Sequence, residues 1–338
     1  MSNRVAVIGA GSFGTCLAML CARDRDVALW ARSADVALEI NTERRNPNYL
    51  SEFEVPERVR ATADLAEALG GAELVICAVP SHSLREVMQR AAPHLDDGAV
   101  IVSTVKGIEH DTGMTMHQVL GDVLDPQHHA RVVCLSGPSF AREIAHRKPT
   151  VVTVASQEET WAVSVQSTLS CPWFRCYSND DVMGVEIGGA LKNVVAIATG
   201  ISDGMETGHN TRAALMTRGL AEITRLGVRL GAKPTTFLGL SGMGDLMLTC
   251  TGDLSRNRRV GLALGEGRKL DEIVQELGEV AEGVRTTRAA CQLAERVGVE
   301  LPIAEMVRRI LDGEHTPLEA GHGLMTRQLG SERFDLDS

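Results

Sequence analysis

The sequence has few aromatic residues and no excess of positive charge. Phe, Trp and Tyr make up only 3% of the 338 residues, which argues against a protein that stacks nucleic-acid bases on many aromatic side chains. Asp and Glu number 44 against 34 Lys and Arg, a formal net charge of −10, whereas a general binder of nucleic acid or anionic membranes is basic. We therefore expect no nucleic-acid partner, and a phosphorylated ligand would need a local positive site.

Segments typical of membranes, secretion and metal sites are also missing. No uninterrupted apolar run reaches the ~20 residues of a membrane span, and the N-terminus lacks the pattern of a secretory signal. The eight cysteines include no C-x-x-C pair, which argues against a zinc site and favours reduced, buried thiols. We expect a cytoplasmic protein with no integral membrane segment and no metal. His128-His129, beside Pro126, is interpreted as a surface loop.

The first half of the chain alternates short apolar runs with helical patterns. Strands buried on both faces read as continuous apolar runs, and their alternation with helices indicates an α/β fold with a parallel sheet and crossover helices. The predicted strands are Arg4–Ile8, Val27–Ala31, Val59–Thr62, Leu74–Val79, Val100–Val105, Val132–Ser136, Thr150–Ala155 and Phe174–Tyr177.

The second half has helical periodicity in nearly every segment. The boundary is predicted near Asn179–Asp181, which gives domains over residues 1–180 and 181–330 and a charged tail over 331–338. The predicted helices are Val182–Met205, Thr211–Leu230, Arg256–Leu264, Leu270–Leu277, Gly283–Val297 and Ile303–Leu311.

A glycine-rich loop follows the first apolar run. Gly9-Ala10-Gly11-Ser12-Phe13-Gly14 fits the pattern G-x-G-x-x-G, which is informative when it follows a strand and opens a helix. In that context the first glycine allows a tight turn, the second lets the backbone approach a pyrophosphate, and the third lets the helix pack on the strand. The N–H groups at the helix start then bind phosphate. We interpret the loop as a dinucleotide site; an incidental glycine-rich turn is the alternative.

The residue placed to contact the adenosine ribose is an arginine. An NAD-specific site usually carries Asp or Glu ~20 residues after the glycine loop, at the end of the second strand. Here that strand ends in Arg32-Ser33, with no carboxylate at its tip. A guanidinium can pair with a 2′-phosphate and stack on adenine. NADP is therefore favoured, and NAD is also possible because nothing repels it. A solvated surface arginine is the alternative.

Lys192 lies in an apolar helical pattern among small residues. Its neighbours three and four positions away are Gly188, Gly189, Val195 and Ala196. A glycine costs ~1 kcal/mol in a helix interior, and space for a ligand beside the ammonium group would offset that cost. Burial would also lower the lysine pKa toward the working pH, as acid–base chemistry requires. A lysine that reaches solvent beside a close helix crossing is the alternative.

Two predicted strands end in residues suited to binding a ligand. Lys106-Gly107 follows one strand, and Ser136-Gly137-Pro138-Ser139-Phe140-Ala141 ends another and starts a helix. Ligands bind outside the carboxyl ends of parallel strands, and a helix start offers free N–H groups. Both segments are candidate contacts; ordinary strand-end loops are the alternative.

Two further candidates lie in the second half. Asp245 is the one carboxylate in the stretch 241–250, so it is either a helix cap or a site residue. Ser255 can cap a helix whose first turn carries Arg256, Arg258 and Arg259. Cations at a helix N-terminus oppose the macrodipole, and a bound anion would reverse that penalty. This turn is a candidate phosphate site; a solvated basic turn is the alternative.

Taken together, these motifs resemble bacterial NAD(P)-dependent glycerol-3-phosphate dehydrogenase. They occur in the family's order and cover nearly the whole chain. The resemblance implies an N-terminal Rossmann-type domain with a mostly parallel sheet and an all-helical C-terminal domain, as in 6-phosphogluconate dehydrogenase. The stretches that carry it are Val7-Ile8-Gly9-Ala10-Gly11-Ser12-Phe13-Gly14, Leu29-Trp30-Ala31-Arg32, Pro80-Ser81-His82, Lys106-Gly107, Ser136-Gly137-Pro138-Ser139-Phe140-Ala141, Gly188-Gly189-Ala190-Leu191-Lys192-Asn193, Gly242-Met243-Gly244-Asp245-Leu246, Ser255-Arg256-Asn257-Arg258-Arg259 and Val280-Ala281-Glu282-Gly283.

The resemblance also implies roles for individual residues. Lys192 matches the family's proton-transferring lysine. Many relatives carry a second basic residue after Arg32, and here it is Ser33, so a 2′-phosphate would be held less tightly. The positions that match substrate contacts are Lys106, Gly137, Ser139, Lys192, Asp245, Ser255, Arg256 and Asn257. Those that match dinucleotide contacts are Gly9, Gly11, Ser12, Phe13, Gly14, Arg32, Tyr49, Lys106, Ala141, Arg256, Val280 and Glu282.

The function that this resemblance implies is the interconversion of dihydroxyacetone phosphate and sn-glycerol 3-phosphate with NAD(P)H. The product would feed phospholipid synthesis. A related β-hydroxyacid or 6-phosphogluconate-type dehydrogenase is the alternative enzyme. A non-catalytic sensor of NAD(P)H is a further alternative, although it would need neither Lys192 nor Asp245. The long apolar helices of the second half leave a homodimer open.

Overall fold

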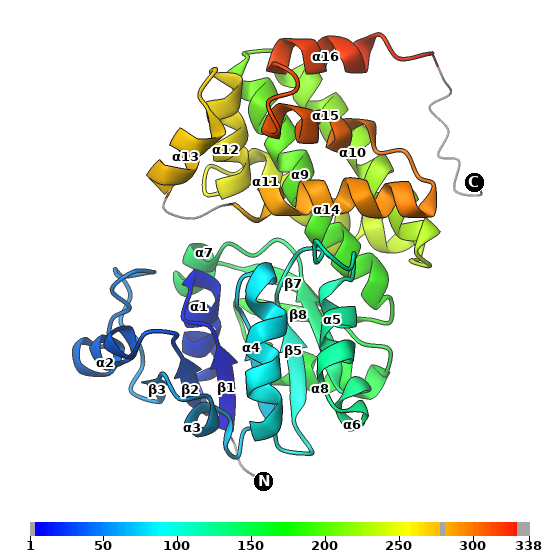
Figure 1. Ribbon diagram of the computed structural model, residues 1–338. Helices are drawn as coiled ribbons and strands as arrows, with labels where there is room; N and C mark the ends of the chain where they lie inside the picture. Colours follow the sequence, from blue (N-terminus) through cyan, green and yellow to red (C-terminus); the bar gives the residue numbers. More distant parts are fainter. Residues whose placement is uncertain (1–3, 278–280, 330–338) are drawn as a thin grey trace. The chain divides into compact units, whose positions relative to one another are not determined.

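The protein forms two compact units in a computed structural model that describes residues 4–277 and 281–329. One unit comprises residues 4–105 and 116–182, and the other comprises residues 106–115 and the described part of 183–329. Figure 1 shows the elements of both units along the chain. The predicted tail over 331–338 and Val280 lie outside the described residues.

The first unit is built on an eight-stranded sheet with the order β3-β2-β1-β4-β5-β6-β7-β8. All neighbouring strands are parallel except β6 and β7, which are antiparallel. The order in which strands are added to the sheet reverses between β1 and β4, and α/β proteins bind ligands at the carboxyl ends of the strands at such a point. The strands are β1 (Arg4–Ile8), β2 (Asp26–Trp30), β3 (Val59–Thr62), β4 (Leu74–Cys77), β5 (Val100–Ser103), β6 (Val132–Ser136), β7 (Thr150–Ala155) and β8 (Phe174–Asn179).

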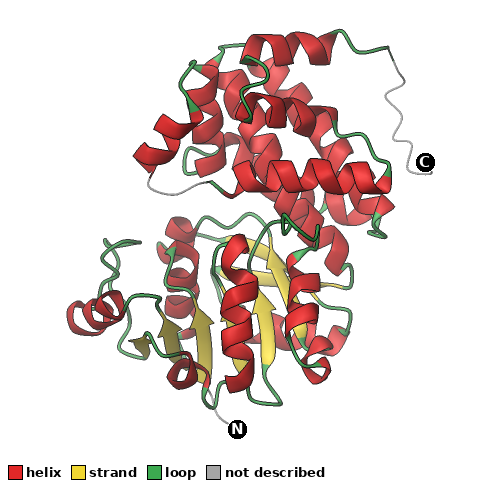
Figure 2. Cartoon of the chain, in the orientation of Figure 1, coloured by secondary structure: helices red, strands yellow, loops and turns green. Residues whose placement is uncertain are grey.

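Helices cover the sheet on both faces (Figure 2). The strands β1, β4, β5 and β6 are almost wholly buried, as expected of parallel strands that are covered on both sides. Helix α1 packs against α7 and α8, whereas α4 contacts α3 and α5. The helices are α1 (Ser12–Cys21), α2 (Ala34–Glu43), α3 (Leu65–Leu69), α4 (Leu84–Ala91), α5 (Met116–Val123), α6 (Pro126–His129), α7 (Ala141–Ala145) and α8 (Glu159–Leu169).

The second unit is helical throughout its described residues from 183 to 329. Its long central helix α9 is apolar and long enough to cross a membrane, but 94% of its most apolar 18-residue stretch is buried inside the protein, as in the core helix of a globular domain. The helices are α9 (Val182–Gly204), α10 (His209–Arg229), α11 (Asp245–Thr251), α12 (Arg256–Gly265), α13 (Leu270–Leu277), α14 (Glu282–Val297), α15 (Pro302–Leu311) and α16 (Pro317–Met325).

Helices α9 and α12 cross at a contact made of glycines. A Cβ atom on Gly200 would lie 2.2 Å from a carbonyl oxygen of α12, and one on Gly261 would lie 2.1 Å from a carbonyl oxygen of α9. Gly204 and Gly265 repeat this arrangement one turn further on. The two backbones therefore touch, and this contact sets where the first turn of α12 lies along α9.

A short segment of the first half joins the core of the second unit. Residues 106–115 fold back on themselves through a bridge between Ile108 and Thr115. Ile108 is 5% exposed and belongs to the hydrophobic core of the second unit, and Arg296 of α14 donates to the Thr112 carbonyl at 2.9 Å. The predicted ranges 1–180 and 181–330 do not include this crossover.

The predicted fold class is confirmed, with a mostly parallel sheet followed by a helical region. All eight predicted strands are present. The antiparallel pairing of β7 with β6 and the helices α11 and α16 were not predicted. The interpretation of His128-His129 as a surface loop was wrong, because these residues end helix α6 and His128 is only 3% exposed.

Candidate active site

Three charged side chains of the second unit meet at Asp245. Asp245 is the first residue of α11, Lys192 lies in the middle of α9, and Lys106 comes from the 106–115 segment. The Lys106 ammonium donates to Asp245 Oδ2 at 2.7 Å, and the Lys192 ammonium donates to Asp245 Oδ1. Each carboxylate oxygen therefore holds one ammonium group, and the three residues together carry one net positive charge.

Burial shapes the protonation of this group. Lys192 is 7% exposed and Asp245 is 1% exposed. Burial lowers the pKa of Lys192 to about 8, with Lys106 adding to the effect and Asp245 opposing it. Burial by itself raises the pKa of Asp245, but the ammonium groups of Lys106 and Lys192 outweigh it, so this pKa lies below its ordinary value. The arrangement combines a permanent carboxylate with a lysine that can gain or lose a proton near neutral pH.

Gly188, one turn before Lys192, allows a close backbone contact and does not leave the space for a ligand that the sequence analysis expected. A Cβ atom on Gly188 would lie 2.7 Å from the carbonyl oxygen of Ser241. The space expected for a ligand is thus taken, at Gly188, by the backbone of Ser241 and Gly242. Because this segment leads directly into α11, its close approach brings Asp245 within reach of Lys192.

Sequence reasoning did not single out Thr249, which contacts this group, or the contact that Asn193 makes beside it. Thr249 Oγ1 accepts a hydrogen bond from Lys192 Nζ at 3.0 Å and donates to the Asp245 carbonyl at 2.6 Å. Asn193, next to Lys192, accepts from Asn257 Nδ2 at 2.9 Å. The helical spacing of four between Asp245 and Thr249 could have indicated the first. The second was visible only as a polar residue in an apolar helix.

The first turn of α12 is joined to both α9 and α14. Ser255 caps the helix by accepting from the Arg258 N–H at 3.3 Å, as predicted. Asn257 Oδ1 accepts from the Gly283 N–H at 2.9 Å, so Asn257 links the turn to the start of α14, where Glu282 lies.

The three arginines of this turn are not equivalent. Arg258 makes ion pairs with Asp203 at 2.8 Å and with Asp253 at 3.1 Å, so two carboxylates of the chain already balance its charge. Arg256 and Arg259 are exposed. Arg258 therefore needs no bound anion to balance its charge, contrary to the expectation for the whole turn.

The glycine loop of the first unit has the geometry that a pyrophosphate requires. Gly9 has a φ of +115°, and a Cβ there would lie 2.6 Å from the Ala78 carbonyl oxygen. A Cβ on Gly14 would lie 1.8 Å from the Gly9 carbonyl oxygen, whereas one on Gly11 would meet nothing within 4 Å. Gly11 is the N-cap of α1 and no side chain caps the helix there, so the first N–H groups lack intrahelical acceptors. These residues fit a dinucleotide.

The remaining predicted contacts of the first unit lie at strand or helix ends. Arg32 is exposed just after β2, and Ser33 caps α2 by accepting from the Val36 N–H at 3.5 Å. Gly137 follows β6 with a φ of +138°, and Ser139 Oγ donates to its carbonyl at 2.9 Å. Ala141 is the first residue of α7. Tyr49 is half-buried in the loop after α2.

The sequence matches family models that describe an NAD-dependent glycerol-3-phosphate dehydrogenase. The model of the N-terminal part matches residues 4–162, and that of the C-terminal part matches residues 181–322. The chain belongs to this glycerol-3-phosphate dehydrogenase family. As a member, it is an oxidoreductase that uses a nicotinamide cofactor.

Similar proteins cover almost the full length of the chain. The glycerol-3-phosphate dehydrogenase (NAD(P)+) of Myxococcus xanthus is 53% identical over 330 residues, which are 97% of this chain and 98% of that protein. The enzyme of the same name from Citrifermentans bemidjiense is 51% identical over 333 residues, or 98% and 99%. The crystal structure of glycerol-3-phosphate dehydrogenase from Coxiella burnetii has a TM-score of 0.91 at 40% identity and covers 96% of this chain and 99% of that one. These likenesses favour the dehydrogenase over the alternative functions.

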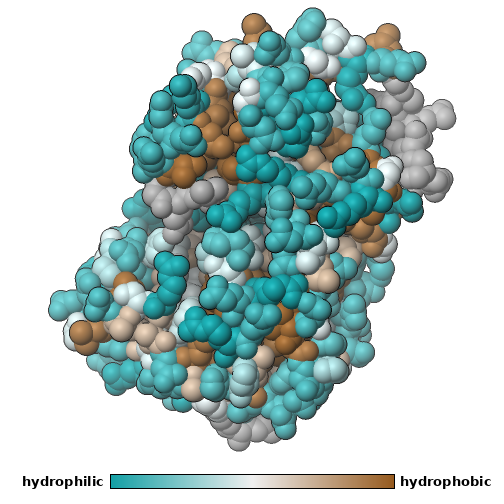
Figure 3. All heavy atoms as spheres, in the orientation of Figure 1, coloured by the Kyte–Doolittle hydropathy of each residue, from teal (hydrophilic) through white to brown (hydrophobic). Residues whose placement is uncertain are grey.

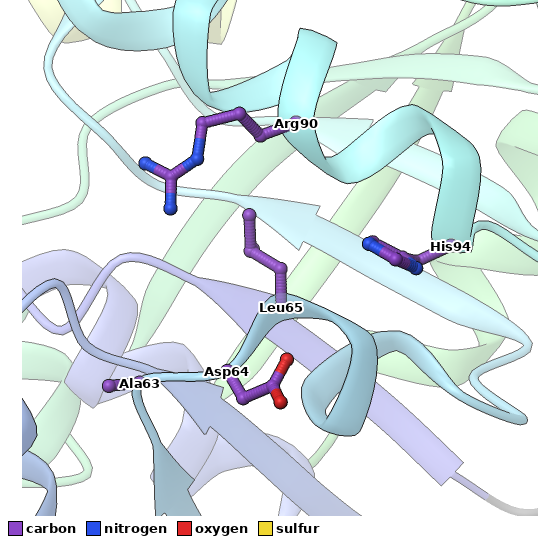
Figure 4. A pocket seen from close by; sticks show the side chains of 5 residues that line it. All are labelled: Ala63, Asp64, Leu65, Arg90 and His94. Atoms are coloured by element: carbon purple, nitrogen blue, oxygen red, sulfur yellow. The ribbon is translucent and has the colours of Figure 1, made fainter.

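A pocket elsewhere in the first unit contains none of the predicted contacts of this dehydrogenase family. It has a volume of about 650 Å3 and is lined by Ala63, Asp64, Leu65, Arg90 and His94 (Figure 4). Arg90 and His94 are exposed, and the Asp64 carboxylate already accepts from the N–H of Ala66 at the start of α3. The pocket therefore offers mixed, solvated charges and no buried polar group.

Proposed function

We propose that the enzyme interconverts dihydroxyacetone phosphate and sn-glycerol 3-phosphate, with Lys192 as the proton-transferring residue. The observation that carries this proposal is the buried group of Lys192, Asp245 and Lys106, in which the pKa of Lys192 is about 8. A general acid or base works best when its pKa lies near the operating pH. The names of the family and of the relatives support the choice of substrate.

The proposed chemistry moves one hydride and one proton. The nicotinamide cofactor, when bound, supplies hydride to substrate C2 in reduction and accepts it in oxidation. As the C2–O π bond opens, its electron pair moves to oxygen, and Lys192 donates a proton from Nζ to that oxygen. The neutral amine then takes a proton from solvent. In oxidation, neutral Lys192 removes the proton of the C2 hydroxyl.

Asp245 and Lys106 prepare Lys192 for this step. Asp245 accepts from Lys192 and holds its ammonium in one place, which reduces the entropy lost on reaching the reactive geometry. Lys106 lies on the other carboxylate oxygen at 2.7 Å, where its charge lowers the pKa of Lys192. The net positive charge of the three residues also attracts a phosphorylated substrate to a chain whose overall charge is −10.

The decisive experiment replaces Lys192. Lys192→Ala should lower the rate of dihydroxyacetone phosphate reduction by about 100-fold or more, the usual scale of lost acid–base catalysis, while NADPH binding is retained. The matched control is Lys269→Ala, which removes an exposed lysine of the same unit and should leave the rate unchanged. Near-normal turnover in Lys192→Ala would exclude Lys192 as the proton-transferring residue.

We further propose that Arg256 binds the substrate phosphate, with Lys106, Gly137, Ser139, Asp245, Ser255 and Asn257 as the other substrate contacts. A charge-assisted contact is worth ~1.5–3 kcal/mol, roughly 10–150-fold in binding. Arg256→Ala should impair dihydroxyacetone phosphate strongly and leave the low rate with dihydroxyacetone almost unchanged. Arg259→Ala, an exposed arginine on the same helix, is the control. Equal losses with both substrates at saturating NADPH would refute this role.

For the cofactor, we propose that NADP(H) is favoured and NAD(H) accepted. Arg32 stands where an NAD-specific site carries a carboxylate, and Ser33, whose hydroxyl caps α2, adds no second charge. The other dinucleotide contacts proposed are Gly9, Gly11, Ser12, Phe13, Gly14, Tyr49, Lys106, Ala141, Arg256, Val280 and Glu282. Most of the proposed dinucleotide contacts thus belong to the first unit, and most of the proposed substrate contacts belong to the second.

The proposal also covers the compartment, the use of the product and the oligomeric state of the enzyme. We propose that it acts in the cytoplasm and that its product feeds phospholipid synthesis. All eight cysteines are free thiols, which suits a reducing compartment. A homodimer remains a proposal that sedimentation would test directly.

A further inference from the structure

The loop after α2 contains one asparagine with no exposed surface. Asn46 is 0% exposed. Its Nδ2 donates to the Ala10 carbonyl at 2.9 Å and to Thr15 Oγ1 at 2.8 Å. Its Oδ1 accepts from the N–H groups of Asn48 and Tyr49, each at 3.1 Å. The side chain therefore uses both amide protons and both lone pairs.

These four partners determine the orientation of the amide group. The Ala10 carbonyl can only accept and the two N–H groups can only donate, so an exchange of Nδ2 and Oδ1 would put like groups together at three of the four contacts; only the Thr15 hydroxyl could adapt. The two ends belong to different parts of the proposed dinucleotide site. Ala10 lies within the glycine loop and Thr15 lies one turn into α1, whereas Tyr49 is in the loop after α2.

The bond to Ala10 has a direct consequence for the glycine loop. A peptide unit is planar and trans, so its C=O and N–H point in opposite directions. Because Asn46 holds the Ala10 carbonyl on its own side, the N–H of Gly11 must point away from Asn46. The Cβ direction of Gly11 meets no atom within 4 Å, so the loop leaves room beside Gly11 for a phosphate to approach.

The far end of the same loop is attached to α7. Arg142 makes an ion pair with Glu52 at 2.7 Å, and the rings of Phe53 and His146 meet edge to face with their centroids 4.7 Å apart. Helix α7 also packs on α1. The loop from Asn46 to Phe53 therefore joins the glycine loop at one end and the helix that begins at Ala141 at the other.

We propose that Asn46 is a positioning residue of the dinucleotide site, which sets the direction of the Gly11 N–H and holds the Tyr49 turn against the glycine loop. The inference rests on the proposed assignment of the glycine loop to the dinucleotide. Asn46 itself makes no contact with the cofactor. Replacing Asn46 should therefore weaken binding of the pyrophosphate and adenosine half of the cofactor and leave proton transfer at Lys192 unaffected.

The test measures binding and turnover separately in Asn46→Ala. We expect the Kd for ADP-ribose, measured by calorimetry, and the KM for NADPH to rise by about tenfold or more, the scale set by buried polar groups left unmatched. The value of kcat at saturating cofactor and the KM for dihydroxyacetone phosphate should change by less than about threefold. An unchanged Kd for ADP-ribose in folded Asn46→Ala would overturn the proposal.

The matched control is Asn41→Ala. Asn41 also bridges two backbone groups, donating to the Ala61 carbonyl at 2.7 Å and accepting from the Ala61 N–H at 2.9 Å, but it joins α2 to β3. It should lower the melting temperature and leave ADP-ribose binding unchanged. An equal loss of ADP-ribose binding in both variants would reduce Asn46 to a general contributor to stability and refute the proposal.

Two more variants keep the outcome decisive. If Asn46→Ala does not fold, the near-isosteric Thr15→Val removes one of the four bonds and should weaken ADP-ribose binding by a few-fold. An unchanged Kd for ADP-ribose in this variant would then refute the proposal.

Gly11→Val tests the assignment of the glycine loop itself, because the valine side chain enters the open space beside Gly11. If Gly11→Val leaves ADP-ribose binding intact, the loop is misassigned. If it weakens binding and Asn46→Ala does not, only the role of Asn46 fails.

Discussion

Lys192 is a cation buried beside a second cation and one carboxylate. Desolvation favours its neutral amine, Lys106 adds repulsion, and Asp245 restores part of the stability of the ammonium form. Removing Asp245 would leave two ammonium groups without their shared partner, which is far more costly than losing a single surface ion pair. The chemistry of Lys192 therefore depends on residues that lie far from it in the sequence.

The pH dependence of turnover should differ between the two directions of the reaction. Reduction needs protonated Lys192, so its kcat should fall as the pH rises through about 8, and oxidation needs neutral Lys192, so its kcat should rise over the same range. Steady-state rates in both directions between about pH 6 and pH 10 measure this. If the two rates changed in the same direction with pH, Lys192 would not be the proton-transferring residue. The control Lys269→Ala should give the same two pH profiles as the wild type.

Arg32 should determine how the enzyme distinguishes its two cofactors. Arg32→Asp replaces attraction by repulsion at a 2′-phosphate, so NADPH should lose at least about tenfold more affinity than NADH, the effect of one charge-assisted contact. The ratio of kcat/KM for the two cofactors gives the answer. An equal loss for both would mean that Arg32 does not contact that phosphate.

At the scale of helices, glycine decides where the α12 turn lies. The crossing of α9 and α12 leaves no room for a Cβ at Gly200, so Gly200→Ala should lower the free energy of unfolding by about 1–3 kcal/mol or more, as overpacking does. Gly121→Ala is the control, since Gly121 lies within α5 and has nothing within 4 Å of its Cβ direction. That change should be neutral or stabilise the protein by a few tenths to about 1 kcal/mol. Chemical denaturation would compare them, and equal effects would contradict the close crossing.

A buried carboxylate joins α10 to α15. Glu222 accepts from the N–H groups of Ile303 at 2.7 Å and Ala304 at 3.3 Å. Burial raises its pKa to about 7, although these hydrogen bonds oppose the shift. Because the folded pKa is above the unfolded one, proton binding stabilises the fold fully below about pH 4.5 and this contribution is lost as the pH rises to about 7.

The difference in unfolding free energy between the wild type and Glu222→Gln should depend on pH. Glu222→Gln cannot ionise, so the wild type should lose stability relative to this variant as the pH rises from about 4.5 to about 7, by up to about 3 kcal/mol. Urea denaturation of both proteins at several pH values measures the difference. A difference that stays constant over this range would show that Glu222 does not titrate with the raised pKa.

At the scale of the whole molecule, the chain carries a net charge of −10 and most of its thiols are buried. Hydrophilic residues predominate on the face shown in Figure 3, with hydrophobic ones in small groups. Six of the eight cysteines are buried and none forms a disulfide. Burial raises the pKa of Cys16, Cys77 and Cys250 to about 12, so these thiols are not ionised at neutral pH.

The six buried thiols should be inert until the protein unfolds. Fewer than eight should react with iodoacetamide in the native enzyme, and all eight after denaturation, because only the thiolate is nucleophilic. A reducing agent should leave the melting temperature unchanged. A lower melting temperature in the presence of reductant would reveal a disulfide and contradict the cytoplasmic assignment.

The sequence by itself determined the features that depend on neighbouring residues. Continuous apolar runs predicted the central strands β1, β4, β5 and β6, because a strand buried on both faces needs no polar position. The glycine loop was recognisable because two of its three glycines, Gly9 and Gly14, have no room for a Cβ atom next to the loop itself and the end of one adjacent strand. The cap at Ser255 followed from local hydrogen-bonding chemistry. The resemblance to the family then placed these segments in one functional order.

Only the tertiary structure decided which distant residues meet. Lys106 and Asp245 are 139 residues apart in the chain, and their contact depends on Ile108 entering the core of the second unit. Gly188 was expected to leave room for a ligand, but the backbone of Ser241 fills that room. Asn46 carried no signal, because a polar residue in a loop is usually solvated. Its burial and four hydrogen bonds arise from packing between segments, which no local pattern encodes.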